Sequence, residues 1–162
     1  MPPAYRELLK GYDMSPIRYE HSIAAIAPRQ LHGLHTGWPN PPSSETFFAS
    51  LSAMNAVVFA LDAESNDVVG YVCGMTDGIL ILYIWDLEVL PEYQNRDVGS
   101  KLLQRLLEKH GNIYQVNANP HSGTQPYFEQ EGFRSVDRSG SEYMTRMHLE
   151  WQNGGPNAVS SD

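Results

Sequence analysis

The stretch that decides the fold spans residues 87–103 and reads LEVLPEYQNRDVGSKLL. An apolar strand stops at Pro91, and a short turn leads directly into a helix whose leucines fall on one stripe and whose charged residues fall outside it. A turn of this kind aims free N–H groups at one point, where the helix N-terminus adds the positive end of its dipole. The stretch therefore predicts a cradle for a pyrophosphate, with an ordinary strand-to-helix turn as the alternative.

Three apolar runs lie before this turn, at residues 56–61, 68–74 and 79–90, and short polar connections separate them. Such spacing is typical of an antiparallel meander. Upstream we expect a strand at 17–20, a helix at 23–34, and a proline-rich loop at 36–42 that carries Trp38. A further helix begins at Ser43 or Ser44, runs to about Met54 and buries Phe47, Phe48 and Leu51.

Beyond the amphipathic helix, which ends at Gly111, the pattern predicts a strand at 113–116, a helix at 125–131 and strands at 133–136 and 143–149. This order favours an α+β fold in one domain, residues 1–151, with a mixed, mostly antiparallel twisted sheet and helices on both faces. Residues 152–162, rich in Gly, Asn and Ser, are expected to form a disordered tail.

Composition limits the partners. The 162 residues include 11 Lys plus Arg against 19 Asp plus Glu, a formal charge of −8. That excess repels phosphate backbones and anionic lipid headgroups, so we expect neither nucleic acid nor membrane as a partner. The one cysteine, Cys73, cannot form an intramolecular disulfide or a cysteine-rich zinc site, and we expect a cytoplasmic protein. A homodimer is compatible with the sequence.

Two motifs carry a resemblance to a known family. Residues 94–99, QNRDVG, match a loop that reads Gln or Arg, two residues, Gly, any residue, then Gly or Ala. Residues 127–133, YFEQEGF, match a motif of an aromatic residue, Tyr, two or three residues and Gly-Phe. With the meander before them, these motifs make residues 38–133 resemble the GNAT superfamily of N-acetyltransferases. The chain departs from the family at Asp97, where the loop has glycine, and at Phe128, where the second motif has tyrosine.

The resemblance implies that acetyl-CoA binds as co-substrate, with its pyrophosphate in the loop and its pantetheine arm beside the strand that precedes it. In this reading the Leu87 N–H polarises the acetyl carbonyl and stabilises the tetrahedral intermediate. Arg96, Lys101 and Arg105 could add cationic contacts to the phosphates. The expected cofactor-binding residues are Leu87, Val89, Gln94, Asn95, Arg96, Asp97, Val98, Gly99, Ser100 and Lys101.

Attack by an amine requires a base, directly or through water. Tyr83, Asp86 and Glu88 are the candidates, since they lie on the strand that would deliver the acetyl group. Asp86 and Glu88 share a face by the alternation of a strand and interrupt an apolar run, where a bare carboxylate is costly to bury. The alternative is that both carboxylates face solvent.

In the family, a tyrosine hydroxyl reprotonates the coenzyme A thiolate. In this chain Phe128 occupies the position of that tyrosine. The tyrosine is displaced by one place to Tyr127, a rotation of about 100° on a helix that could turn its side chain away from the site. Either Tyr127 takes the role, or His121 or Ser122 of the preceding loop replaces it, or the thiolate leaves unassisted.

Asp97 and the residues near Trp38 each have two interpretations. A carboxylate at Asp97 lies close to the expected phosphates in a turn that suits glycine, but it could instead cap the helix. Trp38 either walls the acceptor pocket or packs its loop onto the sheet. His32 and His35 have a spacing that can chelate a metal, but with no third ligand visible we expect no metal site.

Taken together, the sequence predicts an acetyl-CoA-dependent N-acetyltransferase that acts on a small-molecule amine by direct transfer in a ternary complex. Asp97 and Phe128 motivate an alternative, a ligand-binding or regulatory module that has lost acetyl transfer. A third possibility is different acid/base chemistry in the same cleft. The prediction for the fold is specific: the strand with Leu87 and Val89 should diverge from the strand at 113–116 and open a V-shaped slot beside the helix that starts near Val98.

Overall fold

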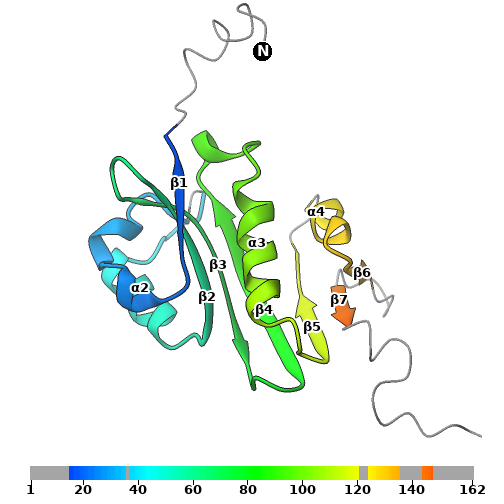
Figure 1. The fold of residues 1–162 in the computed structure, drawn as a ribbon. Helices are drawn as coiled ribbons and strands as arrows, with labels where there is room; N and C mark the ends of the chain where they lie inside the picture. Colours follow the sequence, from blue (N-terminus) through cyan, green and yellow to red (C-terminus); the bar gives the residue numbers. More distant parts are fainter. Residues whose placement is uncertain (1–14, 36, 121–123, 136–143, 148–162) are drawn as a thin grey trace, which may run out of the picture.

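Seven strands form one mixed sheet in the order β1-β2-β3-β4-β5-β7-β6 (Figure 1). The computed structural model describes residues 15–35, 37–120, 124–135 and 144–147. Strands β1 to β4 are antiparallel neighbours, β4 and β5 are parallel, and β5, β7 and β6 are again antiparallel. The predicted α+β class, the meander and the mostly antiparallel sheet are confirmed. The strands are β1 (Ile17–Glu20), β2 (Ala56–Asp62), β3 (Val68–Thr76), β4 (Ile81–Val89), β5 (Gln115–Ala118), β6 (Arg134–Ser135) and β7 (Met144–Met147).

Helices cover both faces of this sheet. The α-helices are α2 (Ser44–Ser52), α3 (Val98–Lys109) and α4 (Gln125–Gln130), and the 3-10 helices are η1 (Ile23–Ala25), η2 (Pro28–Leu31) and η3 (Pro91–Tyr93). Alternation along β2 divides the core: Val58 and Ala60 pack with the buried leucines of α3, whereas Val57 and Phe59 pack with α2 and η2. Figure 1 shows α3 lying along the central strands.

The predicted helix at 23–34 is wrong, because two short 3-10 helices occupy this segment instead. Ile26 and Ala27 between them are extended, with φ −116° and −108°. Pro28 explains the break, since the residue before a proline is pushed out of the helical region and the proline itself donates no hydrogen bond.

The other predicted elements are present with small shifts. The Ser43 side chain caps α2 by accepting from the Thr46 N–H at 3.2 Å, and α3 and α4 begin as expected. Strand β5 begins two residues later than predicted, because the Ile113 N–H still bonds to His110 in the turn after α3. The expected tail at 152–162 lies outside the described residues.

The predicted slot is confirmed by the pairing of β4. Its register with β5 ends at Ile84 and Ala118, while β4 itself continues to Val89. On the other side, the partners of Cys73 and Gly74 are Asp86 and Ile84, so a bulge leaves Trp85 unmatched. Gly74 is required there, because a Cβ would overlap the Tyr83 carbonyl oxygen. The bulge therefore lies where β4 and β5 part.

Within the described residues, no helix combines the length and the apolar character that crossing a bilayer needs.

Candidate functional site

A cavity of about 770 Å³ fills the slot between β4 and β5. Four segments form its walls: the second half of β4, the turn into α3, the end of β5 and the helix α4. The lining residues are Ile84, Trp85, Asp86, Leu87, Val89, Tyr93, Gln94, Asn95, Asp97, Val98, Gly99, Ser100, Ala118, Asn119, Pro120, Thr124, Pro126, Tyr127, Phe128 and Gln130. The start of a twelve-residue helix thus opens into the cavity.

The first N–H groups of α3 are available to an anion. Asp97 occupies the N-cap position but makes no side-chain cap bond, so the capping role considered for its carboxylate is wrong. The bond from the Lys101 N–H to the Asp97 carbonyl, 3.0 Å long, belongs to the first turn. The N–H groups of Val98, Gly99 and Ser100 come before it and have no partner within the helix. Together with the helix dipole they offer the kind of oriented donors that attract an anion.

The turn before α3 adopts the left-handed backbone that glycine favours. Asp97 has φ +56° and Asn95 has φ +59°. Aspartate and asparagine enter this region more easily than other side chains, which explains how the chain keeps the turn without the glycine of the family motif.

Buried hydrogen bonds fix this turn to the sheet. The Tyr93 hydroxyl donates to the Asp62 carboxylate at 2.9 Å, and the same carboxylate accepts from the N–H groups of Glu64 and Ser65. Burial by itself raises the pKa of Asp62, but these hydrogen bonds outweigh it and hold the pKa below its usual value. Gln94 adds a bond from Nε2 to the Val89 carbonyl oxygen at 2.9 Å. These hydrogen bonds therefore hold the turn before α3 in a fixed position against the sheet.

Two N–H groups of β4 point into the slot. The Leu90 N–H donates to Val69 on β3 at 2.9 Å. Because successive N–H groups of a strand alternate sides, those of Leu87 and Val89 point away from β3, toward the side that β5 has left. They are free to bond a ligand that takes the place of a strand.

Tyr127 faces the cavity and the start of α3. A Cβ at Gly99 would overlap its hydroxyl, so the missing side chain of Gly99 makes room for this ring. The hydroxyl is hydrogen-bonded with Ser100, and burial raises the pKa of Tyr127. Phe128, by contrast, is buried in the core with Phe133. The rotation between the two positions thus directs the tyrosine toward the cavity, not away from it.

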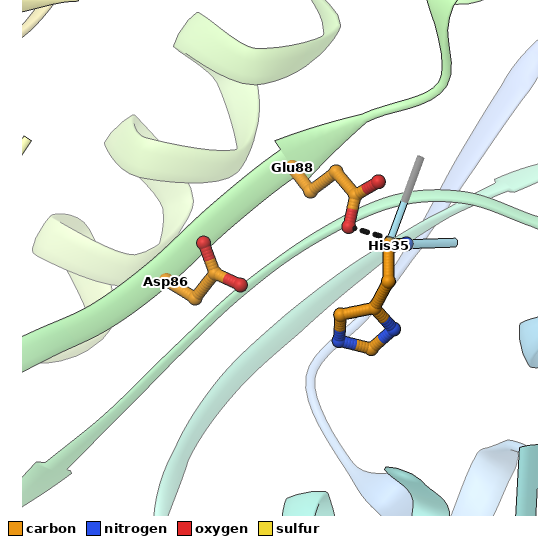
Figure 2. Close-up of side chains that lie close together, drawn as sticks. All are labelled: His35, Asp86 and Glu88. Atoms are coloured by element: carbon orange, nitrogen blue, oxygen red, sulfur yellow. Dashed lines mark hydrogen bonds between the residues drawn. The ribbon is translucent and has the colours of Figure 1, made fainter. Parts of the chain in front are cut away.

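Asp86 and Glu88 meet a histidine on the other face of the sheet. The two carboxylates point from β4 toward the loop that carries His35, whose backbone N–H donates to Glu88 Oε2 at 2.9 Å (Figure 2). The Tyr71 hydroxyl donates to Asp86 Oδ2 at 2.5 Å. Burial, and then the charge of Asp86, raise the pKa of Tyr71 and raise that of Cys73 to about 12. Tyr71 therefore remains a donor.

The predicted site residues divide into three groups. Eight of the ten cofactor residues line the cavity, together with Asp86 and Tyr127. Arg96 and Lys101 lie outside the lining; Arg96 donates to the Ser15 carbonyl at 3.1 Å and stacks on Tyr93, and Lys101 is exposed. Arg105 stacks on the ring of Tyr19.

Of the other predicted residues, Tyr83, Glu88 and Trp38 lie outside the lining of the cavity. Tyr83 is partly buried on β4 outside the lining, and His121 and Ser122 fall outside the described residues. Trp38 is 51% exposed, and its ring lies 4.8 Å from that of His35.

The two histidines considered for a metal are separated in the structure. The Nδ1 atom of His32 lies 3.0 Å from the Arg29 carbonyl oxygen on the surface, whereas His35 is buried. The sequence did not indicate that His35 would meet Asp86 and Glu88, 51 and 53 positions away, because only the path of the loop over the sheet brings them together.

Comparison with known proteins agrees with this geometry. The sequence profile of the acetyltransferase (GNAT) family matches residues 22–133. A candidate acetyltransferase of Deinococcus radiodurans R1 is 31% identical over 75% of this chain and 85% of its own, with a TM-score of 0.71. A GNAT family acetyltransferase of Streptococcus pneumoniae TIGR4 is 26% identical over 77% of this chain and 93% of its own, with a TM-score of 0.61.

A more distant structure shares the fold. An aminoglycoside 6'-N-acetyltransferase complexed with coenzyme A is 12% identical over 82% of this chain and 97% of its own, with a TM-score of 0.63. A comparison with curated protein sequences found no match.

Proposed function

The chain belongs to the acetyltransferase (GNAT) family of enzymes, and we propose that it transfers the acetyl group of acetyl-CoA to a small-molecule amine by direct attack in a ternary complex. One observation carries the proposal: the cavity where β4 and β5 part joins the free N–H groups of β4 to those at the start of α3. An extended amide chain can bond to the N–H groups of β4, and a pyrophosphate at its end can bond to those of α3. A ligand of this form needs both sets of donors in this order.

The residues of the cavity fit coenzyme A. The N–H groups of Val98, Gly99 and Ser100 would hold the pyrophosphate, as oriented donors at a helix N-terminus do. The N–H groups of Leu87 and Val89 would bond the pantetheine arm, with Leu87 also donating to the acetyl oxygen as negative charge develops there. Arg96 and Lys101 stay as candidates for the outer phosphates, because both lie near the helix start.

Two proton transfers accompany the reaction, and the cavity offers a candidate residue for each. The amine must lose a proton as it attacks, and Asp86 is the candidate base that lines the cavity, with Glu88 beside it and Tyr83 as a third candidate. The C–N bond forms as the C–S bond breaks, and the sulfur takes a proton. Tyr127 is the candidate acid, since it faces the cavity and burial keeps its hydroxyl protonated.

The setting of the reaction is also proposed. The excess of acidic residues suits a cationic small molecule better than a nucleic acid. The single, buried Cys73 suits a reducing cytoplasm.

The test is a panel of amines incubated with acetyl-CoA and the whole chain, followed by mass spectrometry of the products and by release of free coenzyme A thiol. We expect one acetyl group on the amine and one thiol per turnover, and we expect Asp86→Asn to lower kcat while coenzyme A affinity stays within two- to three-fold. An enzyme that binds acetyl-CoA but acetylates no member of a panel of diamines, amino acids, aminosugars and alkylamines would contradict the proposal.

A further inference from the structure

Exposed apolar side chains gather along the hairpin of β3 and β4. Among the described residues six large hydrophobic side chains are exposed, and five of them lie within residues 75–85. These five, which we call the hairpin patch, are Met75, Ile79, Leu80, Ile81 and Trp85. Their exposed fractions run from 48% to 71%. Figure 1 shows the hairpin reaching beyond the end of α3, so this helix does not cover its tip.

The patch continues a face of the sheet that is buried elsewhere. Tyr71 and Cys73 on β3 are at most 1% exposed, and they pack in the core that α2 and η2 cover. Met75 follows two residues later on the same face of the strand, yet it is half exposed. The register pairs Met75 with Tyr83, so Tyr83 and, by alternation along β4, Ile81 share this face. The cover over this face therefore ends before the hairpin does.

The patch carries no charge, although the chain has a formal charge of −8. Residues 78–85 read GILILYIW and contain no Lys, Arg, Asp or Glu. Next to them on β5, Gln115 and Asn117 are neutral and bond to each other at 2.7 Å. The Asp77 carboxylate at the turn accepts from three backbone N–H groups of the hairpin. Two copies of this acidic chain can therefore meet at the patch without bringing unpaired carboxylates together.

The size of the patch matches the apolar part of a dimer interface. A large apolar side chain has about 200 Å² of accessible surface, so the exposed parts of the five side chains amount to about 550 Å². A standard interface buries about 800 Å² on each partner, and in homodimers about 65% of this area, roughly 520 Å², is apolar. Soluble monomers rarely expose a contiguous apolar patch larger than a few hundred Å². The patch therefore supplies the apolar area that one side of a stable dimer needs.

We propose that the chain forms a homodimer in which the hairpin patch of one copy packs against the hairpin patch of a second copy about a two-fold axis. Such a contact uses the same surface twice, and an uncharged patch of aliphatic and aromatic side chains is complementary to itself. A lipid surface fits less well, because the patch has no Lys or Arg to meet the headgroups. Trp85 also lines the cavity, so the interface reaches one of its walls. The inference does not depend on the proposed acetyl transfer.

The test measures the mass of the whole chain by sedimentation equilibrium from about 1 to about 200 μM, together with its Tm over the same range. We expect the mass to rise from 18.2 kDa toward twice that value, and Tm to rise with concentration, because association stabilises the folded state by mass action. Ile79→Lys and Ile81→Lys should each weaken the dimer by roughly 100-fold or more, because the two-fold axis buries two lysines in an apolar contact. Both variants make the chain less acidic, so a weaker dimer cannot come from greater overall repulsion.

Gln104→Lys is the matched control, because it adds the same charge at an exposed position of α3, on the other face of the sheet, and it should leave the dimer unchanged. Ile79 is 71% exposed, so lysine there disturbs folding least, and far-UV circular dichroism shows whether each variant is folded.

A wild-type chain that stays monomeric, or a dimer that both lysine variants keep, would overturn the proposal. A monomer that sediments with phosphatidylcholine vesicles would assign the patch to a lipid surface. A monomer that does not would leave the patch to another protein or to residues 148–162 of the same chain, and it would equally refute the second copy.

Discussion

Replacing Asp97 with glycine should make the protein both more stable and a tighter binder of coenzyme A. The residue has φ +56° and no cap bond from its side chain, so the folded state loses no hydrogen bond in the variant. A left-handed conformation costs an L-residue roughly 1 to 2 kcal/mol, somewhat less for aspartate. Against this, the greater freedom of glycine in the unfolded chain lowers the stability of the variant by about 0.4–1 kcal/mol. The net gain is about 0.5 kcal/mol, or a rise in Tm of about 1–2 °C.

The gain in affinity comes from charge. Asp97 lines the cavity next to the N–H groups that would hold the pyrophosphate. Two like charges about 4 Å apart in water repel by about 1 kcal/mol, which corresponds to roughly a five-fold change in Kd. Because the carboxylate is exposed, salt screens this repulsion, and the effect should shrink from 20 to about 500 mM salt.

Calorimetric titration of coenzyme A and thermal melts on the same samples measure both effects, and two variants separate them. Asp97→Asn removes the charge and keeps a side chain that tolerates the turn, so it should gain affinity without gaining stability. Asn95→Gly relieves the same backbone conformation, φ +59°, without changing charge, so it should gain stability without gaining affinity. A lower Tm for Asp97→Gly, or coenzyme A affinity no higher than wild type at low salt, would refute this reasoning.

Further predictions concern the supports of the cradle. Gly99→Ala should displace the Tyr127 ring, because the added Cβ overlaps the Tyr127 hydroxyl. We expect kcat/KM to fall at least ten-fold and the fold to lose about 1–3 kcal/mol of stability, as overpacking of a core does. Unchanged kinetics would contradict this prediction. Arg96→Ala should lower Tm, because the variant loses the hydrogen bond to Ser15. It should also change coenzyme A affinity less than Lys101→Ala does, and calorimetry showing the reverse order would make Arg96 the stronger candidate for the phosphates. The lowered pKa of Asp62 stabilises the fold above the ordinary carboxyl pKa, and this contribution is lost as pH falls through the lowered value. Asp62→Asn should therefore destabilise the protein most at pH 6 to 7 and less near pH 3 in urea unfolding; an equal loss at both would show that the charge is not stabilised.

The sequence predicted the slot and its cradle because local signals define them. Pro91 ends β4, the leucine stripe defines α3, and the loop motif fixes the turn between them. The splay of β4 from β5 followed from the carboxylates that interrupt an apolar strand. Each of these features depends on residues that lie close together in the sequence. A single sequence is therefore enough to predict them.

Contacts across the sheet could not be predicted in the same way. Whether the Asp97 side chain caps α3 depends on its φ, and the direction of the Tyr127 side chain depends on the space that Gly99 leaves. His35 meets Asp86 and Glu88 only because the loop after η2 passes close to β4, a path that no local sequence pattern indicates. The error at residues 23–34 had a local cause, the restriction that Pro28 imposes on Ala27.

The central claim, that acetyl-CoA binds along the free N–H groups of β4 and α3, is tested most directly by amide chemical shifts in a titration of the whole chain with acetyl-CoA. The account predicts the largest shifts at Leu87 and Val89 on β4 and at Val98, Gly99 and Ser100 on α3, with small changes on β1 and β2. Saturable binding that leaves these five amides unmoved, or no binding at millimolar acetyl-CoA, would contradict it.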